Sequence, residues 1–166
     1  MIKPPLRSTR GFTLMEFLVS MALMSLFLLV LTDLMTGMLS LQTESDATSS
    51  IIKDGRYIMQ RFDYDINRAT SVTTPAALGG SGATLAIIIG GVTHTYSVSA
   101  GSLQVVNNLG TINLDGAGST ISGFSVQRLG DVGGKDTVRI TFTATSVALR
   151  NGVAETRTFT TTVGRR

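Results

Sequence analysis

One apolar run near the N-terminus constrains this chain more than any other feature. Residues 12–31 contain one ionisable side chain, Glu16. A helix of about 20 residues, at about 1.5 Å per residue, crosses the roughly 30 Å hydrocarbon core of a bilayer. Lys3, Arg7 and Arg10 precede the run without an acidic residue among them. Because positive flanks stay in the cytoplasm, the sequence predicts one membrane span with a cytoplasmic N-terminus.

The run does not have the form of an ordinary secretory signal. Such a signal has an apolar segment of about 7 to 15 residues, followed by small residues at the cleavage site. Here bulky residues continue beyond Leu31, at Leu34, Met35 and Met38. We therefore expect the run to remain in the mature protein as an anchor.

The residues at the start of the run are more specific than its hydropathy. A carboxylate such as Glu16 inside an apolar helix costs about 2.5 to 3.5 kcal/mol, so it usually marks a partner. The sequence RGFTLME at residues 10–16 follows a short basic head. This order resembles the N-terminus of type IV prepilins, the family of pilins and of type II secretion pseudopilins. The resemblance implies cleavage by prepilin peptidase between Gly11 and Phe12, N-methylation of Phe12, and pairing of Glu16 with the terminal amine of a neighbouring subunit.

Charge and cysteine content limit the function classes. The formal net charge is +3, and loss of the head with Lys3, Arg7 and Arg10 leaves a formally neutral chain. The sequence pI of about 9.7 is therefore no argument for nucleic-acid binding. The chain has no cysteine, which excludes disulfides and thiolate metal sites. Many major pilins carry a C-terminal disulfide loop, so its absence favours a minor pilin or pseudopilin.

After the membrane run, residues 39–69 keep a helical pattern with one apolar stripe. The members of this stripe recur at steps of three and four residues: Ile51, Gly55, Ile58, Phe62, Ile66 and Ala69. Residues 42–50 are polar all round and predict a weak helix or a solvated neck. For Gly37 and Gly55 we favour close packing or mild irregularity over a hinge that bends during assembly. We expect the helix to stop at Thr74-Pro75, because the residue before proline leaves the α region.

A second pattern lies near the end of this helix. Asp63 and Asp65 are two residues apart and so lie on different sides of the helix, which makes a shared acid–base or metal site a poor explanation. Arg61 and Asp65 are spaced to form an ion pair. The arrangement of Arg61, Phe62, Asp65, Ile66 and Ala69 resembles the helix end of minor pilins and of J-type or W-type pseudopilins.

The rest of the chain predicts antiparallel strands. Residues 75–83 form a small, glycine-rich linker, and the composition then shifts to Val, Ile, Thr, Phe and Gly. Residues 84–89, 92–98 and 102–106 predict a meander, and residues 121–129 a further strand. The Asn151-Gly152 pair predicts a hairpin between residues 137–149 and 153–163.

The predicted architecture is α+β and pilin-like: a long N-terminal helix, transmembrane in its first half and amphipathic in its second, packed on an antiparallel sheet. The expected segments are a leader at 1–11, a transmembrane and assembly helix at 12–37, an amphipathic helix at 38–74, and a β-rich globular domain at 75–166.

Catalysis and metal binding have little support. His94 is the one histidine and lies in a strand-like alternation, without a motif for a triad or a zinc site. Asp115, Asp131 and Asp136 are the loop carboxylates that calcium could use, but their loops do not follow the EF-hand pattern, and we favour turn formation. We expect no enzyme activity, metal or cofactor.

The resulting hypothesis is a minor pilin or pseudopilin that initiates or caps assembly of a type IV pilus or type II secretion pseudopilus. Its expected partners are prepilin peptidase, other pilins or pseudopilins, the inner-membrane assembly platform and the lipid bilayer. We expect a bacterial inner-membrane location with a periplasmic domain, followed by transfer to the filament.

Two alternatives stay open. The first is a DNA-uptake pseudopilin with a basic patch formed from Arg128, Arg139, Arg150, Arg157, Arg165 and Arg166. The second is a single-span anchored binding domain that is never processed.

Overall fold

The computed structural model describes residues 13–130, 133–150 and 152–166, with the backbone alone at residue 150. The chain divides into two compact units, Met1–Leu41 and Gln42–Arg166. The helix α1 (Leu14–Arg68) contributes residues to both units. In the first unit α1 is exposed along its whole described length. The second unit combines the C-terminal part of α1 with antiparallel strands.

The first sheet of this unit contains the predicted meander and two further strands. Its spatial order is β1-β3-β4-β5-β6, and all its pairs are antiparallel. The strands are β1 (Ser71–Thr74), β3 (Thr84–Ile89), β4 (Val92–Ser99), β5 (Ser102–Asn107) and β6 (Gly110–Asn113). The structure therefore confirms the three strands expected between residues 84 and 106.

The second sheet has the order β2-β7-β8-β9 and contains the longest strands. Its strands are β2 (Ser81–Gly82), β7 (Ser119–Leu129), β8 (Thr137–Arg150) and β9 (Val153–Gly164). Between Ser122 and Ser125 the β7–β8 register shifts at a bulge, where Gly123 has a φ of 60° that favours glycine. The predicted hairpin of β8 and β9 is confirmed, although Asn151 of its turn lies outside the described residues.

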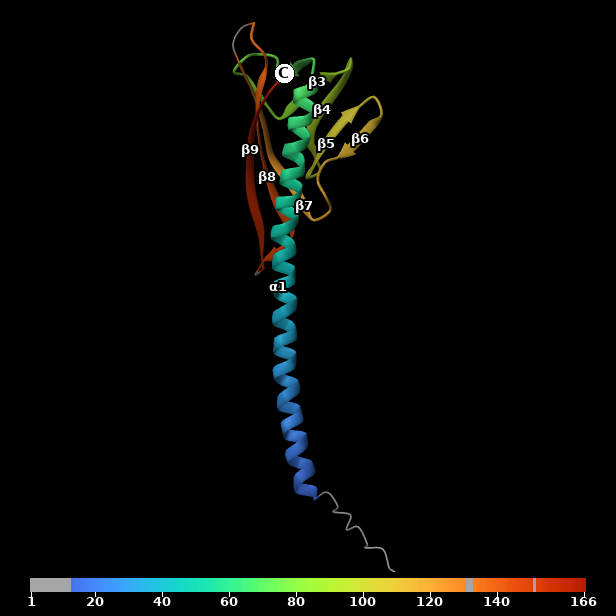
Figure 1. Ribbon diagram of the computed structural model, residues 1–166, viewed down its shortest axis with the longest axis vertical. Helices are drawn as coiled ribbons and strands as arrows, with labels where there is room; N and C mark the ends of the chain where they lie inside the picture. The colour runs from blue at the N-terminus through green and yellow to red at the C-terminus, as the bar shows by residue number, and fades with distance from the viewer. Residues whose placement is uncertain (1–12, 131–132, 151) are drawn as a thin grey trace, which may run out of the picture. The chain divides into compact units, whose positions relative to one another are not determined.

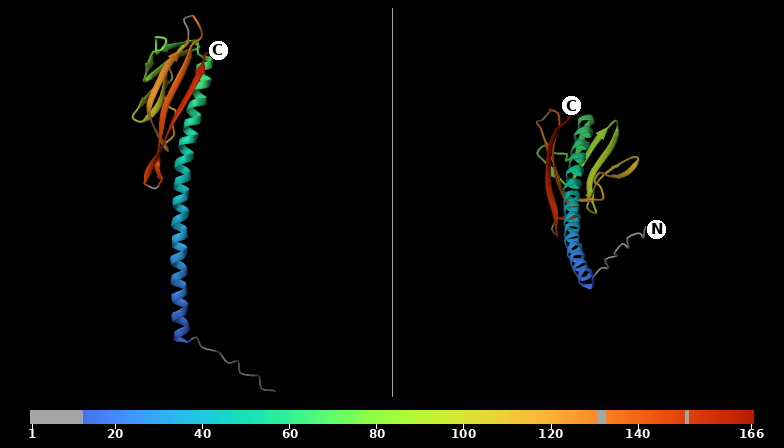
Figure 2. Two further views of the ribbon diagram at one scale, coloured as in Figure 1. Left: turned by 90° about the vertical axis from the view of Figure 1, so that its left-hand side faces the viewer. Right: turned by 60° about the horizontal axis from the view of Figure 1, so that its bottom comes forward.

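One hydrophobic core joins both sheets to the helix. Figure 1 and the right-hand view of Figure 2 show β8 and β9 on one side of the C-terminal part of α1 and β3 to β6 on the other. The predicted apolar stripe of the helix is buried at all six positions. It packs with residues from both sheets, including Leu85, Ile87, Tyr96, Leu103, Val126, Ile140, Phe142 and Val163. The fold is the predicted α+β layout of a long helix against antiparallel sheets.

The helix ends earlier than the sequence predicts, at Arg68 and not at Thr74. The amide of Ala69 donates to the carbonyl of Ile66, which tightens the last turn, and the amide of Thr70 donates to the carbonyl of Ile88. The next residues then form β1, whose Val72 is buried. The prediction was wrong at residues 69–74 because pairing with β3 and burial of Val72 end the helix before the proline acts.

Two further predictions need correction. Residues 75–83 are not only a linker, because Ser81 and Gly82 pair with Gln127 and Val126 as β2. Residues 42–50 are not solvated all round, since Ala47 is fully buried and α1 continues through the stretch. The short strand β6 was not predicted, because its four residues are all exposed and give no alternation of buried and exposed positions.

Candidate functional site

The predicted processing site lies directly before the described part of the chain. Gly11 and Phe12 fall outside the described residues, and α1 begins directly after Thr13. The Thr13 hydroxyl accepts a hydrogen bond from the amide of Glu16 at 3.3 Å, and the Thr13 carbonyl accepts one from Phe17 at 3.1 Å. Thr13 therefore caps the helix and Glu16 lies in its first turn, where the helix dipole favours a negative charge. This cap was not predicted, although Thr13-x-x-Glu16 has the spacing of a capping box.

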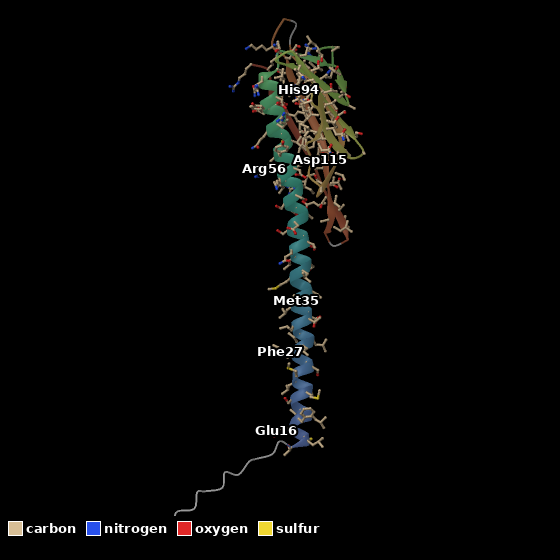
Figure 3. All side chains as sticks on the ribbon, turned by 90° about the vertical axis from the view of Figure 1, so that its right-hand side faces the viewer. Glu16, Phe27, Met35, Arg56, His94 and Asp115 are labelled. Atoms are coloured by element: carbon tan, nitrogen blue, oxygen red, sulfur yellow. The ribbon has the colours of Figure 1, made fainter. Side chains whose placement is uncertain are left out.

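The first unit presents an apolar helix surface that nothing in the unit covers. Every residue from 13 to 41 is exposed, and the large apolar side chains include Leu14, Phe17, Leu18, Leu23, Phe27 and Met35. Figure 3 shows Glu16, Phe27 and Met35 along this part of α1. Among the described helices, α1 has the length and composition to cross a membrane. An apolar surface of this extent indicates contact with lipid or with other proteins.

The polar side chains within this surface are mostly satisfied by the helix itself. Four hydroxyls donate to backbone carbonyls three or four residues earlier in α1. The pairs are Ser25 with Ala22, Thr32 with Leu28, Thr36 with Thr32, and Ser40 with Gly37. Such bonds remove the cost of placing a hydroxyl in hydrocarbon. The carboxylates of Glu16 and Asp33, in contrast, form no hydrogen bond or ion pair with any described residue. These two groups are therefore where a partner would stabilise the apolar part of the helix most.

Within the unit Gln42–Arg166, a second cluster of polar groups joins the C-terminal part of α1 to β4. The Asp65 Oδ2 atom accepts hydrogen bonds from Arg61 Nε at 2.6 Å and from the Tyr96 hydroxyl at 2.5 Å. Burial, followed by the hydrogen bond to Asp65, raises the pKa of Tyr96. Asp63 is exposed and accepts a bond from the Asn67 amide, so the two aspartates lie on different sides as predicted. This cluster is structural, because it joins helix to sheet and Asp65 is only 3% exposed.

Two aspartates at the loop around Asp115 have partners within the protein. Asp115 accepts hydrogen bonds from the Ser102 hydroxyl and the Leu103 amide, both at 2.8 Å. Asp54 of α1, which the sequence analysis did not single out, accepts bonds from the Gly116 amide and the Ser119 hydroxyl. The carboxylate of Asp115 thus fixes its loop, in agreement with the preference for a turn. Asp131 lies outside the described residues.

The arginines of the possible DNA-binding patch are partly engaged with carboxylates. Arg128 contacts Asp136 Oδ1 at 2.6 Å and also donates to the Ala76 carbonyl, and Arg165 lies 3.6 Å from Asp136 Oδ2. Arg157 lies 3.5 Å from Glu155. Arg139 and Arg166 are exposed. The pairing lowers the positive charge that these arginines offer to a phosphate backbone.

His94 stands apart from these clusters. It pairs with Ile87 in the β3–β4 register and is partly exposed, and its Nδ1 atom has no hydrogen-bond partner. Within the described residues no group of three or more His, Cys, Asp or Glu side chains is arranged to hold a metal. Among the described residues, His94 therefore belongs to no such metal-binding group.

Comparison with known families identifies the N-terminal part of the chain. Residues 6–32 match the family model of the prokaryotic N-terminal methylation motif. This match includes Gly11, Phe12 and Glu16 and supports a subunit of the type IV pilin or pseudopilin type, a class that is structural in general. The motif and the apolar helix together fit a membrane-anchored protein. No curated protein and no solved structure matches the chain significantly.

Proposed function

We propose that this chain is a minor pilin or pseudopilin, which initiates or caps a type IV pilus or a type II secretion pseudopilus. The observation that carries the proposal is the methylation motif at residues 6–32 directly at the start of an exposed apolar helix. Prepilin peptidase removes residues 1–11, and Phe12 becomes the methylated N-terminus. Before assembly, the chain is anchored in the inner membrane with its β-rich unit in the periplasm.

Assembly follows from the chemistry of the apolar helix. The Glu16 carboxylate has no partner among the described residues, and an unpaired charge in hydrocarbon is costly. The terminal amine of a neighbouring subunit offers a cation of the right sign. Transfer from lipid to a filament site with that amine lowers the free energy of Glu16, while the surrounding apolar side chains pack against other helices. Glu16 therefore sets the position of each subunit against the next.

The assignment to a minor, J-type or W-type subunit rests on two observations. The chain lacks the cysteine pair of many major pilins. Residues 61–69 carry the pattern described above, and in the structure Phe62, Ile66 and Ala69 lie in the core while Arg61 binds Asp65. A side-chain pattern that docks the helix on its sheet supports a subunit of this type.

Intact mass of the protein isolated from membranes of its own host tests the proposal. We expect a mass that lacks residues 1–11 and carries one added methyl group. A Gly11→Leu variant should keep the leader, because a bulky side chain replaces glycine at the cleavage position. A change in the leader outside the motif, Ile2→Leu, should leave processing unchanged. Retention of residues 1–11 in the native protein would contradict the proposal and favour an unprocessed anchor.

A further inference from the structure

The outer face of α1 in the unit Gln42–Arg166 carries a row of basic and aromatic side chains. Lys53, Tyr57, Arg61, Tyr64 and Arg68 recur at steps of three and four residues, and we call them the outer stripe. Such positions share one side of a helix, and the row extends over about 22 Å. The stripe lies on a different side of α1 from its buried positions, such as Ile51, Ile58 and Phe62.

The fold leaves this face uncovered within the unit. The two sheets flank α1 in Figure 1, but the left-hand view of Figure 2, turned by 90°, shows the strands of both on one side of it. Figure 3 shows Arg56 on the side of α1 away from the strands. Tyr57 is 49% exposed and Tyr64 is 54% exposed. Large tyrosine side chains with this exposure are common at protein interfaces, where one ring face is apolar and the hydroxyl stays polar.

The side chains of the stripe are partly held in place. The Arg68 guanidinium lies 4.8 Å from the centroid of the Tyr64 ring and donates a hydrogen bond to the Tyr64 hydroxyl. Arg61 is held by Asp65 through its Nε atom, which orders its side chain and lowers the positive charge that it offers to a partner. Side chains that are already ordered lose less entropy on binding than free ones. The ordered side chains of the stripe thus favour binding of a negatively charged hydrogen-bond acceptor.

The charge on this face has one dominant sign. Lys53, Arg61 and Arg68 lie on the stripe, and Arg56 beside it is exposed. The nearby carboxylates already have partners: Asp54 binds Gly116 and Ser119, and Asp65 binds Tyr96 and also Arg61 of the stripe. Asp63, at the flank, accepts from Asn67. The complementary surface is therefore an acidic one.

We propose that the outer stripe binds an acidic face of another subunit in the same filament, an inference that rests on the proposed function. Tyrosine and arginine together are the residue types that contribute most to protein–protein binding. A single-stranded nucleic acid fits less well, because base stacking needs open ring faces and Arg68 occupies one face of Tyr64. The stripe gives this subunit its choice of neighbour, whereas the apolar helix gives general affinity for the filament.

A photo-crosslinking experiment in the native host tests this inference. A benzoylphenylalanine placed at Gln60, which is exposed between Tyr57 and Tyr64, is used in the full chain. We expect an adduct with a second pilin-type subunit through a peptide that contains acidic residues. Lys53→Glu combined with Arg68→Glu should reduce the yield of this adduct about tenfold, since two attractions become repulsions. Arg139→Glu combined with Arg166→Glu makes the same charge change at exposed positions elsewhere and should leave the yield unchanged.

The outcomes separate this inference from the proposed function. When an acidic residue of the crosslinked peptide is replaced by lysine, the variant with Lys53→Glu and Arg68→Glu should form the adduct again. Such a recovery would exclude misfolding of the double variant as the cause of the lower yield. Equal yields for both double variants, an adduct with nucleic acid, or no protein adduct from a processed chain would overturn the stripe inference and leave the proposed function intact. A chain that retains residues 1–11 by intact mass in the same cells would overturn both.

Discussion

The Tyr96 hydroxyl lies 2.5 Å from Asp65 Oδ2, the same oxygen that accepts from Arg61. Tyr96 is fully buried on β4, and Asp65 is 3% exposed on α1. The Phe62 ring packs against the Tyr96 ring with centroids 5.1 Å apart. One buried carboxylate therefore joins helix and sheet by hydrogen bonds at the centre of an otherwise apolar contact.

Tyr96→Phe tests the value of this bond. The change keeps the ring in the core but leaves Asp65 with one donor fewer in a site that water does not reach. Hydrogen bonds to charged groups contribute about 1.5 to 3 kcal/mol, so we expect a loss of this size in the free energy of unfolding. Urea unfolding of the detergent-solubilised chain, followed by circular dichroism, measures it. Tyr57→Phe removes an exposed hydroxyl and should change stability by less than about 0.5 kcal/mol; equal losses in both variants would contradict the assignment.

The same tyrosine makes stability depend on alkaline pH. Burial raises the pKa of Tyr96, and the hydrogen bond to Asp65 raises it further, whereas in the unfolded chain the pKa of tyrosine is about 10. The folded state thus holds a proton that the unfolded state releases above about pH 10. The stabilisation is complete below that pH and falls at higher pH, by at most about 1.4 kcal/mol per pH unit. In the Tyr96→Phe variant this part of the pH dependence should disappear, and its persistence would assign the effect to other groups.

The helix stripe and the strands were predictable because burial repeats along the chain with a regular period. Ile51, Gly55, Ile58, Phe62 and Ile66 are all buried, as their spacing indicates. The end of the helix was not predictable in the same way. Thr70 to Thr74 has no strong local signal, and its conformation depends on pairing with β3, which lies more than ten residues further along the chain. Non-local pairing overrides local preference at such positions.

The same difference between local and non-local signals determines which residues of the candidate sites could be predicted. Glu16 stood out because a charge in an apolar run is anomalous in the sequence itself. The partners of Asp65 and Asp54 could not be assigned, since Tyr96 and Ser119 are far away in sequence and become neighbours only in the fold. Arg61 and Asp65 were paired correctly because both lie on one helix, four residues apart.

Gly55 is a position of close approach between α1 and β9. A Cβ atom at Gly55 would lie 2.3 Å from Cζ of Phe159, and the Phe159 ring is itself stacked on Phe142 with centroids 5.3 Å apart. Gly55→Ala should therefore destabilise the protein by about 1 to 3 kcal/mol despite the better helix propensity of alanine. Phe159→Leu in the same chain should recover part of the loss in a double-mutant cycle. A more stable Gly55→Ala variant would show that the ring moves away at little cost.

Glu16 has two possible contributions, and one substitution separates them. The amide of Glu16 binds the Thr13 hydroxyl, and the spacing of the two residues would also allow the Glu16 side chain to accept from the Thr13 amide and so to support the first turn of α1. Glutamine serves this role almost as well as glutamate, but it offers no charge to an amine. If Glu16 pairs with the terminal amine of a neighbour, Glu16→Gln and Glu16→Leu should both be processed normally and both enter filaments poorly. If capping is its main contribution, only Glu16→Leu should be impaired. The fraction of processed subunit in sheared filaments, measured by immunoblot against the membrane-bound fraction, decides between the two, with Met15→Leu as the control that alters the same turn without a charge.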